Sequence, residues 1–139
     1  MWYMRACNIT TTKALNAIGR EESRATKTTK MRSNWLLDYL AIHPNAKIRY
    51  WQSDMILPIH SDALFLVEWD AKSNYGGYFY LEWNQNDDEP QKTNGAVDVS
   101  ASLLPLVAMS VSEAELGVTF YNAKKVKVLR LTLEEMGWK

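Results

Sequence analysis

The sequence is poor in the residues that build disulfides, zinc sites and membrane spans. It has 139 residues but only one cysteine, Cys7, and two histidines, so an internal disulfide and zinc-type Cys/His spacings are excluded. No window approaches ~18 consecutive apolar residues, which argues against a transmembrane helix. The first residues, "MWYMRACNITTTKALNAIG", lack the apolar core and cleavage site of a signal peptide. We therefore expect an intracellular protein, cytoplasmic or nuclear.

Net charge is also absent, because 16 basic and 16 acidic residues cancel. A neutral chain argues against a free-standing, high-affinity nucleic-acid binder. The charges are nevertheless unevenly placed: residues 1–50 hold nine Lys and Arg against three Asp and Glu, and residues 51–100 hold two against nine. The basic residues of the first third either contact phosphates within a larger assembly or form a solvated helix face; they include Arg20, Arg24, Lys27, Lys30 and Arg32.

What the sequence does contain is enough apolar residues, 47%, for a globular core. Two helices are predicted first, in "TTKALNAIGREES" (11–23) and "TTKMRSNWLLDYLAIHP" (28–44). Thr28 or Thr29 is the expected N-cap of the second, and His43-Pro44 its end. We assign residues 1–46 to this helical segment and residues 47–139 to a second domain.

From Lys47 onward the pattern becomes alternating, which is typical of strands. "KIRYW" (47–51) is expected to be extended. Three strands are predicted in "MILPIHSDALFL" (55–66), "GYFYLEW" (77–83) and "AVDVSA" (96–101). Short connections between them predict an antiparallel meander.

The last segment, residues 110–137, is predicted to be one long helix. Steps of three or four residues trace a continuous stripe that should face the sheet, made of Val111, Glu115, Val118, Asn122, Val126, Leu129, Leu133 and Met136. Glu113 lies about 200° around the axis from Glu115 and should face water. The fold class expected is therefore α+β, with a three-stranded antiparallel sheet, one long packed helix and two preceding helices.

Two carboxylates stand out in this arrangement. Asp62 lies inside an apolar strand, where an uncompensated charge costs several kcal/mol. Glu115 lies in the first turns of a helix packed on that sheet, so the two can meet and share a hard cation such as Mg²⁺. The alternative is structural: Asp62 ends its strand, and Glu115 sits near the favourable N-terminal dipole of its helix. His60, two residues from Asp62, is either a ligand or base, or a hydrogen-bonded neighbour.

Several short motifs resemble, in order, the ribonuclease H-like domain of copia-type LTR retrotransposon polyproteins and the connection segment downstream of the reverse transcriptase. They are "LLDYLAIHPNAKIRYWQSDMILPIHSDA", "AKSNYGGYFYL", "NGAVDV" and "SEAELG…NAK…LRLTLEEMG". In that family a metal-bridging Asp lies within "SDA", which matches Asp62. A metal-binding Glu lies within "AEL" or "AEY", which matches Glu115 and not Glu113.

The resemblance extends to the second strand, where the family places a basic residue, a Ser and a glycine before an aromatic pair. The matching positions are Lys72, Ser73, Gly77, Tyr78 and Phe79. The family often has a second basic residue where Asn74 stands. The implied chemistry is hydrolysis of the RNA strand of an RNA–DNA hybrid by two Mg²⁺ ions, with Asp62 and Glu115 as metal ligands and Lys72 and Ser73 as substrate contacts.

The family continues into a further strand that carries a third acidic ligand within "TDN", and this motif is not found here. The resemblance therefore implies a partial domain, truncated at both ends, with weak or absent metal binding and little activity. The alternative is a non-catalytic interaction module or retroelement remnant. A missing neighbouring strand would also leave the Asp62 strand with an open edge, which either "KIRYW" covers or a second molecule pairs with.

Overall fold

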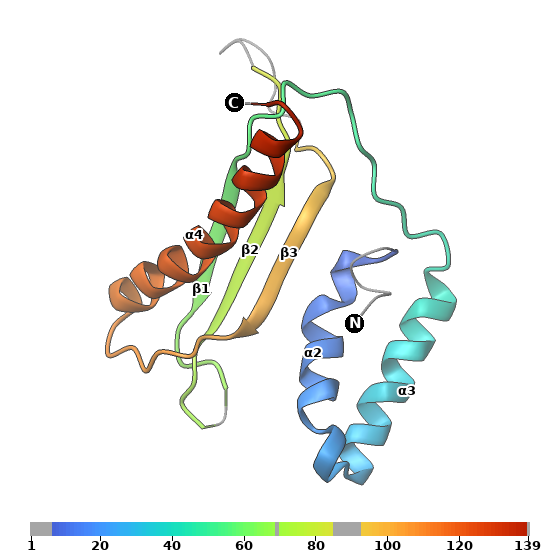
Figure 1. The fold of residues 1–139 in the computed structure, drawn as a ribbon. Coiled ribbons are helices and arrows are strands. Elements are labelled where there is room, and N and C mark those ends of the chain that lie inside the picture. Colours follow the sequence, from blue (N-terminus) through green and yellow to red (C-terminus); the bar gives the residue numbers. More distant parts are fainter. Residues whose placement is uncertain (1–6, 69, 85–92, 139) are drawn as a thin grey trace. The chain divides into compact units, whose positions relative to one another are not determined.

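The structure is a computed structural model that describes residues 7–68, 70–84 and 93–138 (Figure 1). The chain divides into two compact units, Met1–Ile48 and Arg49–Lys139. The division falls two residues after the boundary expected at residue 46. Each unit is described by itself. Among the described residues, no helix has both the length and the apolar character required to cross a membrane.

The first unit is helical. It contains the 3₁₀ turn η1 (Ile9–Thr11), helix α2 (Thr12–Arg20), the turn η2 (Glu22–Arg24) and helix α3 (Lys27–Ile42). The N-cap of α3 is Thr26, and the expectation of Thr28 or Thr29 is wrong. Thr29 N–H donates to Thr26 Oγ1 at 3.2 Å and Thr26 N–H donates to Thr29 Oγ1 at 3.0 Å. This reciprocal capping box moves the start of the helix to Lys27.

The second unit is a three-stranded antiparallel sheet in the order β1-β2-β3, with one long helix. Its strands are β1 (Ile59–Leu64), β2 (Asn74–Tyr80) and β3 (Ala96–Leu103). Together with the helices of the first unit, this confirms the predicted α+β class and the antiparallel meander. Asp62 pairs with Gly76, and Gly76 pairs with Ala101 on the other side.

The "KIRYW" segment forms no regular strand and does not cover the edge of β1, which was one of the two outcomes expected for that edge. Its backbone is held by a side chain instead of a neighbouring strand. Trp51 N–H donates to Asn94 Oδ1 at 2.8 Å, and Asn94 Nδ2 donates to Trp51 O at 3.1 Å. The Tyr50 hydroxyl donates to Ala96 O at 3.0 Å. The segment therefore lies near the start of β3 and does not pair with the free edge of β1.

Strand β1 is also shorter than the predicted run of residues 55–66. Met55 and Leu66 have φ values of 60° and 50°, a left-handed conformation that a strand cannot contain. Pro58 has no N–H to donate, and the pairing before β1 is reduced to an isolated bridge between Ile56 and Glu82. These residues confine regular pairing to the six positions of β1.

Helix α4 (Val111–Glu135) lies across one face of the sheet (Figure 1). A core cluster of Leu104, Ala108, Ala114 and Val118 is surrounded by Ala63, Phe65, Tyr75 and Tyr121. The predicted stripe is buried at its centre, where Val118 and Asn122 are 0% and 1% exposed. At its ends Val111 and Met136 are exposed, because the helix extends past the sheet.

Candidate functional site

Asp62 lies in β1, which is an edge strand of the described sheet. The residue is exposed, so its charge stays hydrated and needs no buried partner. The expected desolvation cost was therefore wrong, because it assumed that the apolar residues around Asp62 in the sequence surround it in space.

The face on which Asp62 lies follows from its neighbour Ser61. Asn122 of α4 donates through Nδ2 to Ser61 Oγ at 2.5 Å, so Ser61 points toward the helix. Successive side chains of a strand point to opposite faces. Asp62 therefore leaves β1 on the face that α4 does not cover.

Glu115 is half-buried and lies seven residues before Asn122, which is almost two full turns and places it on the same side of α4. Tyr121 and Lys125 lie on the opposite flank: the Tyr121 ring is 6.0 Å from that of Tyr75 in β2, and Lys125 Nζ is 2.7 Å from Asp98 Oδ2 in β3. Glu115 therefore lies on the β1 side of the helix. The structure does not bring Asp62 and Glu115 together on one face: Asp62 leaves the β1 edge on the open face, and the helical geometry puts Glu115 on the α4 side.

No third metal ligand accompanies them in the part of the chain that the structure describes. Among those residues there is no group of three or more His, Cys, Asp or Glu side chains that could hold a metal ion.

Glu113, expected in water, is half-buried and caps the start of α4. Its carboxylate accepts from Met109 N–H at 2.8 Å, while its own N–H donates to Ser110 Oγ at 3.1 Å. An acidic side chain here also interacts favourably with the helix dipole. The two neighbouring carboxylates thus differ in role, as expected, but Glu113 is a structural cap and is not simply solvated.

Lys72 and Ser73, the substrate contacts implied by the family resemblance, both have partners within the β1–β2 connection. Lys72 Nζ forms an ion pair with Asp70. Ser73 is 3% exposed; its hydroxyl accepts from Leu66 N–H at 3.1 Å, and its carbonyl accepts from Leu104 N–H at 2.9 Å. In this structure the Ser73 hydroxyl stabilises the turn in which Leu66 has positive φ. Of Lys72 and Ser73, only Lys72 is exposed to solvent.

A polar cluster lies at the centre of the helix–sheet interface. Besides its bond to Ser61, Asn122 Nδ2 donates to Gly76 O at 2.9 Å. A Cβ on Gly77 would lie 2.7 Å from Asn122 Oδ1, so only glycine fits there. The buried Asn122 Oδ1 and Ser100 Oγ have no hydrogen-bond partner among the described residues. The helical stripe had identified Asn122 as a polar residue facing the sheet. That Asn122 packs against Gly77 could not be predicted without knowing the strand register.

The face of the sheet opposite α4 carries an aromatic group that includes His60. His60 Nε2 is 3.0 Å from the Tyr80 hydroxyl, and the two rings stack at 5.3 Å. Burial, and then the charge of Glu82, raises the pKa of Tyr80, so this phenol stays protonated at neutral pH. The hydrogen-bond partner of His60 is therefore Tyr80, whereas the expectation from the sequence placed it beside Asp62.

Two structural side chains were missed in the sequence. Asn94, 3% exposed, bonds both to Trp51 and, through Nδ2, to Leu81 O at 2.7 Å. Asp98 pairs with Lys125 across the helix–sheet interface. The "NG" dipeptide at residues 94–95 indicated a turn, but no local pattern connects Asp98 with a lysine 27 residues away.

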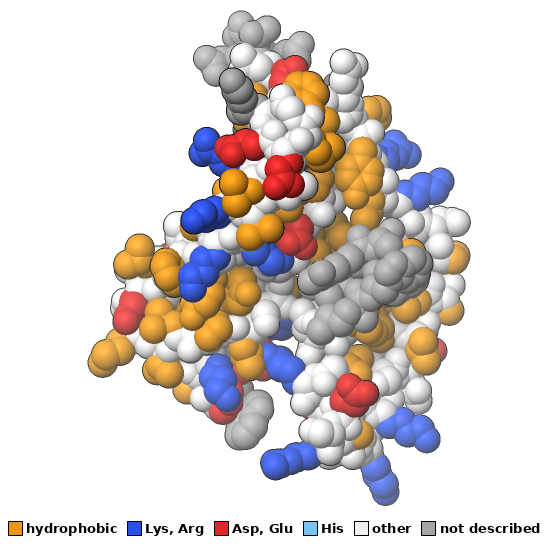
Figure 2. Space-filling view, viewed as in Figure 1, with side chains coloured by type: hydrophobic (Ala, Val, Ile, Leu, Met, Phe, Trp, Pro, Cys, Tyr) orange, Lys and Arg blue, Asp and Glu red, His pale blue; other side chains and the backbone are white. Residues whose placement is uncertain are grey.

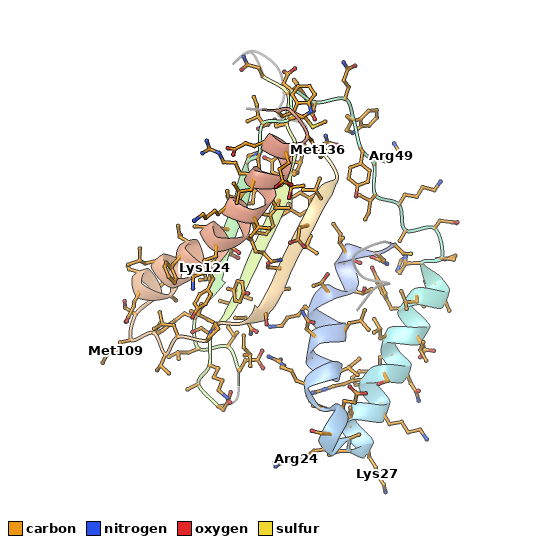
Figure 3. All side chains as sticks on the ribbon, in the orientation of Figure 1. Arg24, Lys27, Arg49, Met109, Lys124 and Met136 are labelled. Atoms are coloured by element: carbon orange, nitrogen blue, oxygen red, sulfur yellow. The ribbon has the colours of Figure 1, made fainter. Side chains whose placement is uncertain are left out.

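The basic residues of the first unit gather around the connection of α2 and α3, where Figure 3 labels Arg24 and Lys27. Arg32 forms an ion pair with Glu21, and Glu21 also accepts from the Thr29 hydroxyl at 2.6 Å. Arg32 and Thr29 of α3 are thus joined through Glu21 to the start of η2.

No protein-family model matches this sequence, and no match was found among curated proteins or among solved structures.

Proposed function

We propose that residues 49–139 form part of a ribonuclease H-like unit whose carboxylates Asp62 and Glu115 bind Mg²⁺ next to an RNA–DNA hybrid. The proposal rests on one observation, an antiparallel meander followed by a helix across it, with Asp62 in its first strand. The helical geometry that puts Glu115 on the β1 side of α4 supports it. The ordered motifs of a copia-type retrotransposon polyprotein support it from the sequence.

The ion would lie beside β1, beyond the edge of the sheet. Asp62 can reach such a position from the open face and Glu115 from the α4 side, which reconciles their different faces with a shared cation. Mg²⁺ is commonly held by one or two carboxylates, waters and substrate phosphates. Lys72 would move from Asp70 to a phosphate of the hybrid, a small loss because exposed ion pairs contribute little.

We expect the isolated chain to cleave hybrids poorly or not at all. The two-metal mechanism needs ions roughly 3.5–4 Å apart, and converging anions must offset their repulsion. Asp62 and Glu115 supply two negative charges against the four positive charges of two Mg²⁺ ions. The substrate phosphate adds one, which leaves the second ion weakly held.

Binding is tested with Mn²⁺, a paramagnetic substitute for Mg²⁺, and amide NMR spectra. We expect selective broadening around residues 61–63 and 114–116, which is reduced in both Asp62→Asn and Glu115→Gln. Glu113→Gln is the matched control, because that carboxylate caps the helix, and it should leave the broadening unchanged. Broadening centred elsewhere, or insensitive to both substitutions, would contradict the proposed site.

Cleavage is tested separately with a labelled RNA–DNA hybrid in Mg²⁺ and in Mn²⁺. We expect no product from the wild-type chain in Mg²⁺ beyond that of Asp62→Asn. Cleavage by the wild type alone would show that two carboxylates are enough, and the charge argument above would be wrong.

A second function, a non-catalytic interaction module, is favoured by large apolar side chains that remain in solvent. Trp35 on α3 and Leu116 on α4 are 61% and 72% exposed. Side chains of this kind mark interaction sites when they gather on one surface. If Mn²⁺ broadens the amide signals around neither Asp62 nor Glu115, we would replace the nuclease proposal with this function.

A further inference from the structure

The side of α4 that faces away from the sheet carries a second regular stripe. Its members are spaced alternately by three and four residues, the repeat of a helix that packs along another helix: Glu113, Leu116, Phe120, Ala123, Lys127, Arg130 and Glu134. We call these seven residues the outer seam. Leu116 and Phe120 at its centre are 72% and 58% exposed. Figure 2 shows apolar, basic and acidic side chains side by side over the region of this helix.

We propose that the outer seam is a self-association surface, on which α4 of a second copy of this chain packs in the antiparallel direction. This inference does not depend on the proposed nuclease function, since it involves the helix side opposite Asn122 and the sheet.

The charge order of the seam selects the antiparallel direction. Its first member, Glu113, is acidic, the basic members Lys127 and Arg130 follow the apolar centre, and the last member, Glu134, is acidic again. In a parallel pair each of these residues would face its own copy, and like charges would repel. In an antiparallel pair Glu113 lies next to the two basic residues of the other copy, at both ends of the contact.

The side-chain sizes fit the same arrangement when the two-fold axis passes between Phe120 and Ala123. Each Phe120 ring then packs on the small Ala123 of the second copy, and the aliphatic part of Lys127 covers Leu116. Lys124 Nζ, 4.3 Å from the centre of the Phe120 ring, already covers the exposed ring from one side (Figure 3).

The charged groups can change partners at little cost. Arg130 Nε is 2.9 Å from Glu134 Oε1, an exposed pair within the helix that contributes little. Glu113 accepts one backbone hydrogen bond, and its carboxylate retains capacity for a cation. Isologous contacts of this type close as dimers. A single helix pair is small beside a standard interface, so we expect association to depend on concentration.

Sedimentation velocity over a concentration series tests the proposal. We expect the wild-type sedimentation coefficient to rise toward a dimer, and Phe120→Lys to remain monomeric throughout. Val128→Lys is the matched control: Val128 is 63% exposed on the same helix but lies off the seam, so this variant should associate like the wild type. Far-UV circular dichroism checks that each variant retains its helix.

The direction of the helices is tested by Lys127→Gln, which removes one charge. Association should weaken in an antiparallel pair, because Glu113 of the second copy loses a partner. It should strengthen in a parallel pair, because a lysine–lysine repulsion disappears. A strengthened dimer, a wild type that stays monomeric, or a Phe120→Lys variant that associates like the wild type would each overturn the proposal.

Discussion

At the scale of single residues, the closest fit in the second unit is between Gly77 of β2 and Asn122 of α4. A Cβ at residue 77 would lie 2.7 Å from Oδ1 and 3.0 Å from Cγ of Asn122. Asn122 cannot simply turn away, because its Nδ2 bonds to Ser61 and to Gly76 O. Glycine here is a packing requirement of the helix–sheet contact.

We therefore predict that Gly77→Ala lowers the free energy of unfolding by about 1–3 kcal/mol, the usual cost of overpacking. Urea unfolding of the second unit, followed by tryptophan fluorescence, measures it. Gly76→Ala is the control, since a Cβ there would be 3.9 Å from the nearest carbonyl oxygens, which is an ordinary contact. Equal losses in the two variants would mean that glycine is needed for its backbone freedom and not for the space beside Asn122.

Asp62 shows where inference from single residues failed. Its apolar neighbours in the sequence suggested a buried charge, but burial depends on which strands and helices cover a residue. The structure covers β1 with α4 on one face only, and Asp62 points to the other. The sequence does not show which face of a strand a distant helix will cover. Neither the exposure of Asp62 nor its face relative to Glu115 could therefore be predicted.

At the scale of elements, helices were predictable where one periodic face is buried. The stripe through Val118 and Asn122 predicted α4 and the buried side of its first half, whereas the stripe members at its two ends, Val111 and Met136, are exposed. Strand limits were less predictable. Met55 and Leu66 fit an alternating apolar pattern, yet their positive φ values end the strand, and tertiary contacts such as that of Ser73 with Leu66 set such conformations.

The start of α4 leads to a prediction at this scale. Ser110, the N-cap, accepts from Glu113 N–H, and Glu113 in turn accepts from Met109 N–H. We expect Ser110→Ala to destabilise the second unit by about 0.5–2 kcal/mol, because the first-turn N–H loses its acceptor. Thermal unfolding measures the change. Ser112→Ala, an exposed position in the same first turn, should be close to neutral, and a similar loss there would contradict the capping role.

At the scale of the whole molecule, the two units differ in what they bury. The second unit buries Phe79, Leu104 and Val118 almost completely. In the described part of the first unit the buried residues, each 5% exposed or less, are all polar: Asn8, Thr11, Thr12 and Thr29. Several of its large apolar residues remain accessible: Trp35, Leu37 and Ile42 are 61%, 62% and 73% exposed.

An apolar cavity of about 400 Å³ also opens between α2 and α3, lined by residues that include Ala14, Ala17, Trp35 and Tyr39. Small alanines opposite large rings leave this space unfilled, so the contact between the two helices loses dispersion energy. Helices without a fully buried apolar core have little tertiary stabilisation, and α2, with nine residues, is too short to be stable alone.

We therefore predict that amides of α2 and α3 exchange with deuterium at least tenfold faster than those of β2 and the centre of α4. Exchange from α2 and α3 needs only local opening, whereas exchange from β2 requires the sheet and its core to unfold. Native-state hydrogen exchange read by mass spectrometry measures this. Ala14→Leu, which would partly fill the cavity, should slow exchange in α2 and α3 and leave β2 unchanged. Equal protection of all these elements would show that the first unit is stabilised by contacts other than those described here, and the argument from its polar interior would be wrong.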